Sequence, residues 1–265
     1  MKPGERQYLL ETTRSTTIIS TRSTINIGAW NVRTMYKAGK ATQAAAELRR
    51  YKIAILGVSE SRWTGSGQKR LITGELLLYS GHENENAPHT QGVALMLSNQ
   101  APRALIGWEA HCPRIITATF KTKIRRINMD IIQAYAPTND SKEDKDEFYN
   151  RLMTFIQNRP RRNILILMGD FNAKIGSDNG GYEECMGQQG LCEMNENGEG
   201  LADLCATNNL VIGGLFHYKR IHKATWVSPD ISIENQIKKF RRSLHDVRVK
   251  RGSDVASDHH ILDNT

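Results

Sequence analysis

Short runs of apolar residues recur along the chain from position 25 onward, and turn-forming residues separate them. Short runs rich in Val, Ile and aromatic residues are typical of β-strands. Several runs contain no polar position, which is typical of strands that are covered on both faces. We therefore predict strands over residues 25–30, 53–58, 76–79, 93–97, 115–120, 127–135, 164–168 and 210–212.

Three other segments have the apolar spacing of helices. Residues 40–50 contain an Ala-rich run, and Ala has the highest helix propensity. Residues 141–157 open with Ser and acidic side chains and place Phe148 and Leu152 on one face. A third helix is expected over residues 200–208. Many strands with a few intervening helices predict a layered α/β domain.

The length of 265 residues suits one large domain or two small ones, and no linker divides the chain. We predict one domain over residues 25–265, preceded by a flexible tail over residues 1–24. No apolar run approaches the roughly 20 residues that a membrane span needs, so we expect no membrane association. None of the four cysteines forms a CxxC pair, and reduced thiols suit a nuclear or cytoplasmic protein.

Polar side chains follow four of the apolar runs directly, and a further pair comes near the C-terminus. They are Asn31, Glu60, Tyr135, Asp170, Asn172, Asp258 and His259. Layered α/β proteins place their sites at strand ends. Carboxylates are hard oxygen ligands that suit Mg²⁺, and a metal with few protein ligands leaves positions for water and a phosphodiester. Taken singly, each residue also fits a solvated turn or a cap.

The chain resembles the endonuclease/exonuclease/phosphatase superfamily, which includes DNase I-like and apurinic-site endonucleases, in an ordered set of motifs. These are Ala29-Trp30-Asn31, Ser59-Glu60, Tyr135-Ala136-Pro137, Gly169-Asp170-Phe171-Asn172, Thr225-Trp226 and Ser257-Asp258-His259. Longer stretches resemble the endonuclease domain of RTE-type non-LTR retrotransposons and craniofacial development protein 2-like proteins. The resemblance implies a DNase I-like, four-layered α/β sandwich, in which two mixed β-sheets pack face to face between helices.

The resemblance also implies a role for each residue. Glu60 would be the principal ligand of Mg²⁺, with Mn²⁺ as a substitute, and Asn31 would lie beside it. Asp258 would support the metal and His259. Asp170 would orient or deprotonate the attacking water. The contacts to the phosphate would come from Asn172, Tyr135 and His259.

The expected substrate is DNA. The net charge of +8 favours polyanionic partners. Basic residues gather before the Thr-Trp motif, where they are either phosphate-backbone contacts or parts of a solvated loop. The candidate substrate-binding residues are Lys219, Arg220, His222, Lys223 and Trp226. In the retrotransposon setting this domain nicks genomic DNA and exposes a 3′-hydroxyl, and we expect it to act as a monomer.

The chain departs from the family pattern at two places. Relatives carry an Asp that hydrogen-bonds the catalytic His, in a strand after the Thr-Trp motif. Here Glu234-Asn235-Gln236-Ile237 runs directly into Lys238, so that Asp is missing, and the final strand is shortened. An imidazole without an orienting acceptor loses its fixed tautomer. Three functions stay open: a DNA endonuclease with weakened or lost activity, a non-catalytic DNA-binding module, and a phosphatase of the same superfamily.

Overall fold

The computed structural model describes a large part of the chain in full, and a few further segments by their backbone alone. The full description covers residues 25–84, 86–138, 141, 145–175, 181–182, 185 and 193–212. The backbone alone is described for residues 226–227, 234–235, 248–250 and 261–264. The predicted tail over residues 1–24 and residues 236–247, where the missing Asp was expected, lie outside the described residues.

The first of the two large sheets has seven strands in the order β12-β13-β1-β2-β5-β4-β3. β1 and β2 run parallel, and their neighbours run antiparallel to them, so the sheet is mixed. The bounds are β1 (Ile27–Asn31), β2 (Ile55–Ser59), β3 (Ser66–Arg70), β4 (Leu76–Ser80), β5 (Val93–Leu97), β12 (Arg248–Lys250) and β13 (Ile261–Asn264).

The second sheet has four strands in the order β6-β7-β8-β9, and it is also mixed, because β8 and β9 run parallel. Its bounds are β6 (Leu105–Cys112), β7 (Ile115–Lys121), β8 (Asn128–Tyr135) and β9 (Ile164–Asp170). A separate two-stranded sheet is formed by β10 (Trp226–Val227) and β11 (Glu234–Asn235).

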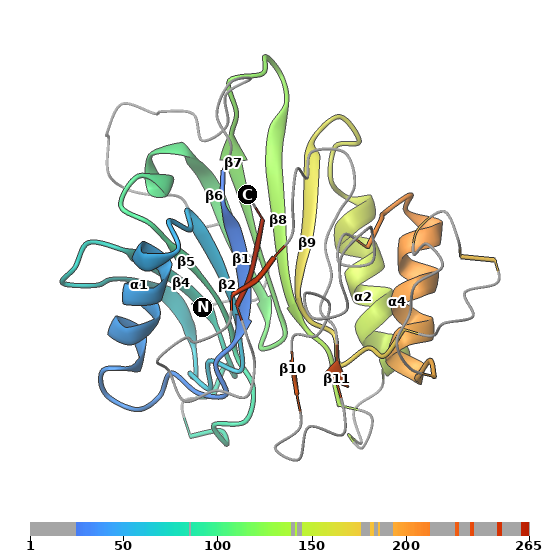
Figure 1. Cartoon of the computed structure of the whole chain (residues 1–265), viewed down its shortest axis with the longest axis horizontal. Coiled ribbons are helices and arrows are strands. Elements are labelled where there is room, and N and C mark those ends of the chain that lie inside the picture. Colours follow the sequence, from blue (N-terminus) through green and yellow to red (C-terminus); the bar gives the residue numbers. More distant parts are fainter. Residues whose placement is uncertain are drawn as a thin grey trace.

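Helices cover the outer face of each large sheet (Figure 1). α1 (Lys40–Arg50) lies on the first sheet, whereas α2 (Lys145–Gln157) and α4 (Glu196–Thr207) lie together on the second. A short 3-10 turn, Ala101–Ala104, precedes β6. The predicted four-layered α/β sandwich of two packed mixed β-sheets is therefore confirmed.

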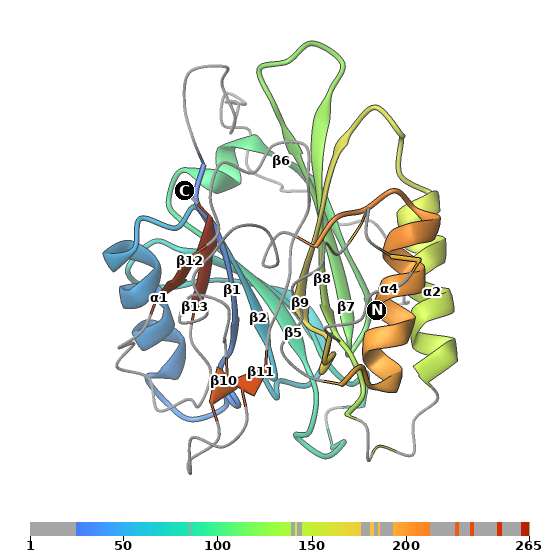
Figure 2. The ribbon, with the colours of Figure 1, turned by 45° about the vertical axis from the view of Figure 1, so that its right-hand side comes forward.

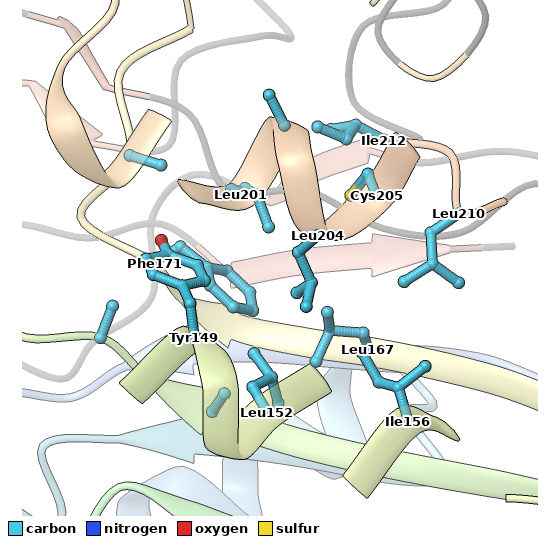
Figure 3. Packing of buried hydrophobic residues seen from close by; sticks show 14 of the residues in the cluster. Tyr149, Leu152, Ile156, Leu167, Phe171, Leu201, Leu204, Cys205, Leu210 and Ile212 are labelled. Atoms are coloured by element: carbon cyan, nitrogen blue, oxygen red, sulfur yellow. The ribbon is translucent and has the colours of Figure 1, made fainter. Parts of the chain in front are cut away.

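Three apolar clusters hold these layers together. One lies between α1 and the first sheet, and a second, which includes Trp108 and Phe120, lies between the two sheets. In the third, Leu152 of α2 and Leu204 of α4 meet Leu167 of β9 (Figure 3). A buried side chain of this kind stabilises the fold by about 1.5–3 kcal/mol. The middle layer fixes how the two sheets lie against each other.

The predicted elements differ from the structure at several places. The strands β3 and β6 were not predicted. β3 has the sequence SGQKR, which contains no large apolar residue. Such a sequence can form a strand here because β3 is the exposed edge of its sheet. The strand predicted over residues 210–212 is wrong, since Leu210 and Ile212 donate to the carbonyls of Cys205 and Cys185 instead of pairing in a sheet. α4 begins four positions earlier than predicted, where the Asn195 side chain caps it.

Candidate active site

Two pairs of strand ends meet at one edge of the molecule. In the parallel pair of the first sheet, Asn31 lies opposite Ser59. In the parallel pair of the second sheet, Tyr135 lies opposite Asp170. The two pairs lie side by side between the helical layers (Figure 2). Polar residues that are far apart in sequence are therefore delivered to one place, which we call the catalytic edge.

The side chain of Asn31 joins the two sheets at this edge. Its Nδ2 donates to Glu60 Oε1 at 2.7 Å and to Asp170 Oδ2 at 2.7 Å. Its Oδ1 accepts a hydrogen bond from the backbone N–H of Arg33 at 2.9 Å. Asn31 and Asp170 are buried, and Glu60 is partly exposed. Two carboxylates thus converge on a single amide nitrogen in a water-poor setting.

Glu60 and Asn172 leave their strands in left-handed backbone conformations, with φ of 56° and 48°. Residues other than Gly rarely adopt such conformations, and those that do concentrate at functional sites. Gly169, one residue before Asp170, has a φ of 142°, and a Cβ there would lie 1.8 Å from the carbonyl oxygen of Ala134. β9 can therefore approach β8 only because this position is Gly.

Buried hydrogen bonds fix the position of Asp170. Its backbone N–H donates to Ser59 Oγ at 3.2 Å, and Gln133 Nε2 donates to the same oxygen at 3.0 Å. Its Oδ1 accepts from the backbone N–H of Asn172 at 3.0 Å. Asn195, the cap of α4, donates to the carbonyl of Asn172 at 2.9 Å, so a helix end also holds this loop. The carboxylate is held from both sheets and from α4.

The hydroxyl of Tyr135 stays protonated at neutral pH. Burial raises the pKa of Tyr135 well above its usual value, and the negative charges of Glu60 and Asp170 raise it further. The guanidinium of Arg114 lies 5.0 Å from the centre of the Tyr135 ring and donates to the Tyr135 carbonyl at 3.1 Å. Tyr135 is therefore a hydrogen-bond donor held at the same edge as the two carboxylates.

Basic and aromatic side chains border the catalytic edge on the side of the first sheet. Arg62 Nη2 lies 3.4 Å from Glu60 Oε2. The Arg62 carbonyl contacts His89 Nδ1 at 2.9 Å, and the His89 ring packs on the exposed ring of Tyr36. A groove of about 600 Å³ continues from there between α1 and the edge strand β3, and Lys37 is among its lining residues. This border therefore presents cations and aromatic ring faces beside the two carboxylates.

The residues present fit a divalent cation in part. Glu60, Asp170 and the Asn31 carboxamide are oxygen-bearing groups, which Mg²⁺ prefers, and Mg²⁺ commonly takes only one or two protein carboxylates. A cation would also relieve the repulsion between the two converging carboxylates. Within the described residues, no group of three or more His, Cys, Asp or Glu side chains is placed to bind a metal.

The structure brings together Asn31, Glu60, Tyr135, Asp170 and Asn172. The remaining predicted site residues lie outside the described residues, apart from the backbone of Trp226 in β10; these are Lys219, Arg220, His222, Lys223, Asp258 and His259. The sequence did not single out Arg62 and Arg114. Each follows a polar or turn position, where a single Arg gives no distinctive pattern, and only the fold places it beside Glu60 or Tyr135.

Solved structures share this architecture. The endonuclease domain of TRAS1, a telomere-specific non-LTR retrotransposon, matches with a TM-score of 0.60 and 14% identity, over 91% of this chain and 96% of that one. The AP endonuclease LMAP from Leishmania major matches with a TM-score of 0.65 and 11% identity, over 91% and 86%. The 3′ phosphatase NExo from Neisseria, bound to a product DNA hairpin, matches with a TM-score of 0.61 and 17% identity, over 91% and 99%. The chain has the DNase I-like endonuclease/exonuclease/phosphatase fold.

Sequence comparison adds a nearer relationship. The chain is homologous to craniofacial development protein 2: it is 34% identical over 244 residues to the protein from Tragulus javanicus and to the one from Bos taurus. The match covers 89% of this chain but only 41% and 40% of those relatives, so the chain spans about two fifths of their length. No protein-family model matches the sequence. Among the described residues, no helix is long and apolar enough to cross a bilayer.

Proposed function

We propose that this chain binds DNA and hydrolyses a phosphodiester bond with the help of Mg²⁺ or Mn²⁺. The observation that carries the proposal is the convergence of Glu60 and Asp170 on Asn31 at the meeting point of the two sheets. A buried polar network of this kind is costly unless it is satisfied, so its presence at strand ends points to chemistry. The metal, when bound, would stabilise the charge that builds up on the phosphate.

In the proposed reaction, Glu60 and Asn31 would hold the metal, with Asp258 as a further ligand. Asp170 orients a water molecule and accepts its proton as the water oxygen attacks phosphorus. The bond to the 3′ oxygen breaks, and His259, supported by Asp258, gives that oxygen a proton, which leaves a 3′-hydroxyl. The Asn172 amide and the protonated Tyr135 hydroxyl donate to the phosphate oxygens. General acid–base help of this kind contributes about 10²–10⁴ in rate.

We propose DNA as the substrate because basic side chains border the site, and because the NExo structure with the same fold is bound to a DNA hairpin. Lys219, Arg220, His222, Lys223 and Trp226 would extend this contact. The retrotransposon-like stretches favour a nick in duplex DNA over the release of phosphate from a monoester. We further propose that the domain works as a monomer in the nucleus or the cytoplasm.

A second candidate function is a DNA-binding module without turnover. The specific observation that favours it is the missing Asp after Ile237, because His259 would then lack the carboxylate that orients its ring in relatives. In a protease whose His loses its orienting Asp, the rate falls about 10⁴-fold. An endonuclease with this loss should therefore nick DNA slowly, whereas the binding module should not nick it at all.

A plasmid-nicking assay in Mg²⁺, run beside the Asp170→Ala variant, tests the proposal. We expect relaxed plasmid from the wild-type chain, none above background from the variant, and none from either in EDTA. Plasmid binding by both proteins without Mg²⁺-dependent nicking would establish the binding module instead. Inorganic phosphate released from a monoester, without nicking, would establish a phosphatase.

A further inference from the structure

A second charged surface lies at the far end of the second sheet from the catalytic edge. β8 and β9 end at the catalytic edge, so the turn before β8 and the loop before β9 lie at the opposite end, roughly 20–25 Å away along the strands. Figures 1 and 2 both show these two connections side by side. Their six exposed cations form what we call the distal basic surface: Lys121, Lys123, Arg125, Arg126, Arg161 and Arg162.

The charges of this surface are not neutralised locally. The connections over residues 121–128 and 158–163 contain no Asp or Glu. None of the six cations forms a salt bridge with another residue in the part of the chain that the structure describes. The nearby carboxylate of Asp130 is buried and accepts from Thr119 and Asn163, so it faces inward. The surface therefore projects positive charge toward solvent.

Hydrogen bonds fix the conformation of the two connections. Asn163 Oδ1 accepts from the backbone N–H of Asn128 at 3.1 Å, which ties the loop to the turn. Thr122 Oγ1 accepts from the backbone N–H of Ile124 at 3.2 Å, which closes the turn on itself. Arg159 Nη2 donates to Thr117 Oγ1 at 3.1 Å, which anchors the loop to β7. Little ordering entropy is then lost when the surface binds a partner.

The composition of the surface selects the kind of partner. Exposed Lys and Arg without acidic neighbours suit phosphate groups, and each phosphate neutralised releases counterions from a nucleic acid. The two connections contain no aromatic residue, so they offer no platform on which unpaired bases could stack. Ile124 is the one large apolar side chain exposed there among the described residues, which is too little to insert into a membrane.

We propose that the distal basic surface binds the phosphate backbone of a nucleic-acid duplex, as a second contact separate from the catalytic edge. A duplex held there supplies affinity without sequence preference. The surface does not depend on the hydrolysis proposed above. It would bring a second DNA segment, or a distant part of a bent one, to the domain that holds the nick site.

Binding of a short labelled duplex to the full chain in EDTA tests this proposal, because EDTA removes the metal that the proposed hydrolysis needs. The main variant combines Lys121→Gln, Lys123→Gln, Arg125→Gln and Arg126→Asn, since Asn tolerates the left-handed backbone at position 126. We expect binding to weaken about tenfold or more at moderate salt. The slope of log affinity against log salt should flatten by roughly 0.9 for each phosphate that the variant no longer neutralises.

Two further variants keep the test decisive if the first one folds poorly. The pair Arg161→Gln and Arg162→Gln should weaken binding on its own, whereas the matched pair Arg50→Gln and Lys52→Asn, exposed at the end of α1 and outside the groove, should not. The charge-preserving pair Arg125→Lys and Arg126→Lys should bind like wild type.

An affinity and a salt slope equal to those of the matched pair, in both neutralised variants, would overturn the proposal. The proposal would also be overturned if the neutralised variants lost binding to anionic vesicles but bound the duplex as tightly as the wild-type chain. Failure of the wild-type chain to nick plasmid would count against the proposed hydrolysis and leave this result unaffected.

Discussion

The two ends of the second sheet differ in the sign of their charged side chains and in how these side chains are held. Where β8 and β9 end, Glu60 and Asp170 are held by hydrogen bonds to one amide nitrogen at 2.7 Å each. Where these strands begin, six cations point into solvent without a salt bridge among the described residues. The first arrangement depends on distances set by strand register. The second depends only on the number of charges, because phosphate attraction acts over a Debye length of about 10 Å.

The comparison predicts that geometric changes harm the catalytic edge, while only loss of charge harms the distal basic surface. The largest effect is expected from Asp170→Asn, which keeps the shape of the side chain but removes its capacity to accept a proton. Nicking should fall by about 10²–10⁴, while duplex affinity stays the same or rises slightly. The exposed substitution Asp146→Asn is the matched control and should leave the nicking rate unchanged. Equal rates for the two variants would remove Asp170 from the reaction.

A purely steric change at the same strand end should also be severe. Gly169→Ala places a Cβ 1.8 Å from the Ala134 carbonyl oxygen, so β8 and β9 must separate. We expect a loss of about 2–4 kcal/mol in the free energy of unfolding. Gly65→Ala is the control, because Gly65 also has a positive φ but nothing within 4 Å of its Cβ position, and it should lose only about 1 kcal/mol. Urea unfolding measures both, and similar losses would contradict the close approach.

A charge added between the two carboxylates should make stability depend on metal. Asn31→Asp replaces the donor that Glu60 and Asp170 share by a third carboxylate at a buried position, at a cost of about 1–3 kcal/mol. Mg²⁺ should restore part of that loss, which a thermal unfolding scan with and without Mg²⁺ would show. The exposed control Asn158→Asp should unfold at the same temperature in both buffers. An Asn31→Asp variant that is indifferent to Mg²⁺ would argue against a metal at this edge.

The smallest effect concerns a buried group beside the loop that carries part of the distal basic surface. The pKa of His111 is lowered from 6.5 to about 4, mainly by burial and in part by the nearby Arg159, while the Glu109 carboxylate opposes the shift. The folded protein therefore keeps this ring neutral while the unfolded chain takes up a proton, so stability falls as the pH drops from 6.5 toward 4. His111→Gln should make the urea midpoint less dependent on pH over that range. An unchanged dependence would mean that His111 titrates normally in the folded state.

The sequence predicts the sheets well, because most of their strands are buried and read as continuous apolar runs. It does not predict β3, whose residues are all polar or Gly. It wrongly predicts a strand over residues 210–212, which pack in the core without strand pairing. The strand-end residues Asn31, Glu60 and Asp170 are found because each follows an apolar run.

Contacts between residues that are far apart in the sequence cannot be predicted from the sequence pattern. Arg62 and Arg114 become candidate site residues only because the fold places them beside Glu60 and Tyr135. The distal basic surface is likewise assembled from two connections that are separated by a whole helix. A local pattern carries no information about which connections lie side by side.

The central claim is that Glu60, Asn31 and Asp170 surround one divalent cation. Anomalous scattering from crystals of this protein soaked in Mn²⁺ tests it most directly. We predict one strong Mn²⁺ peak within coordination distance of a Glu60 carboxylate oxygen, and its loss in crystals of Glu60→Gln. A Mn²⁺ peak found only away from these three side chains, or one that persists unchanged in Glu60→Gln, would contradict the account.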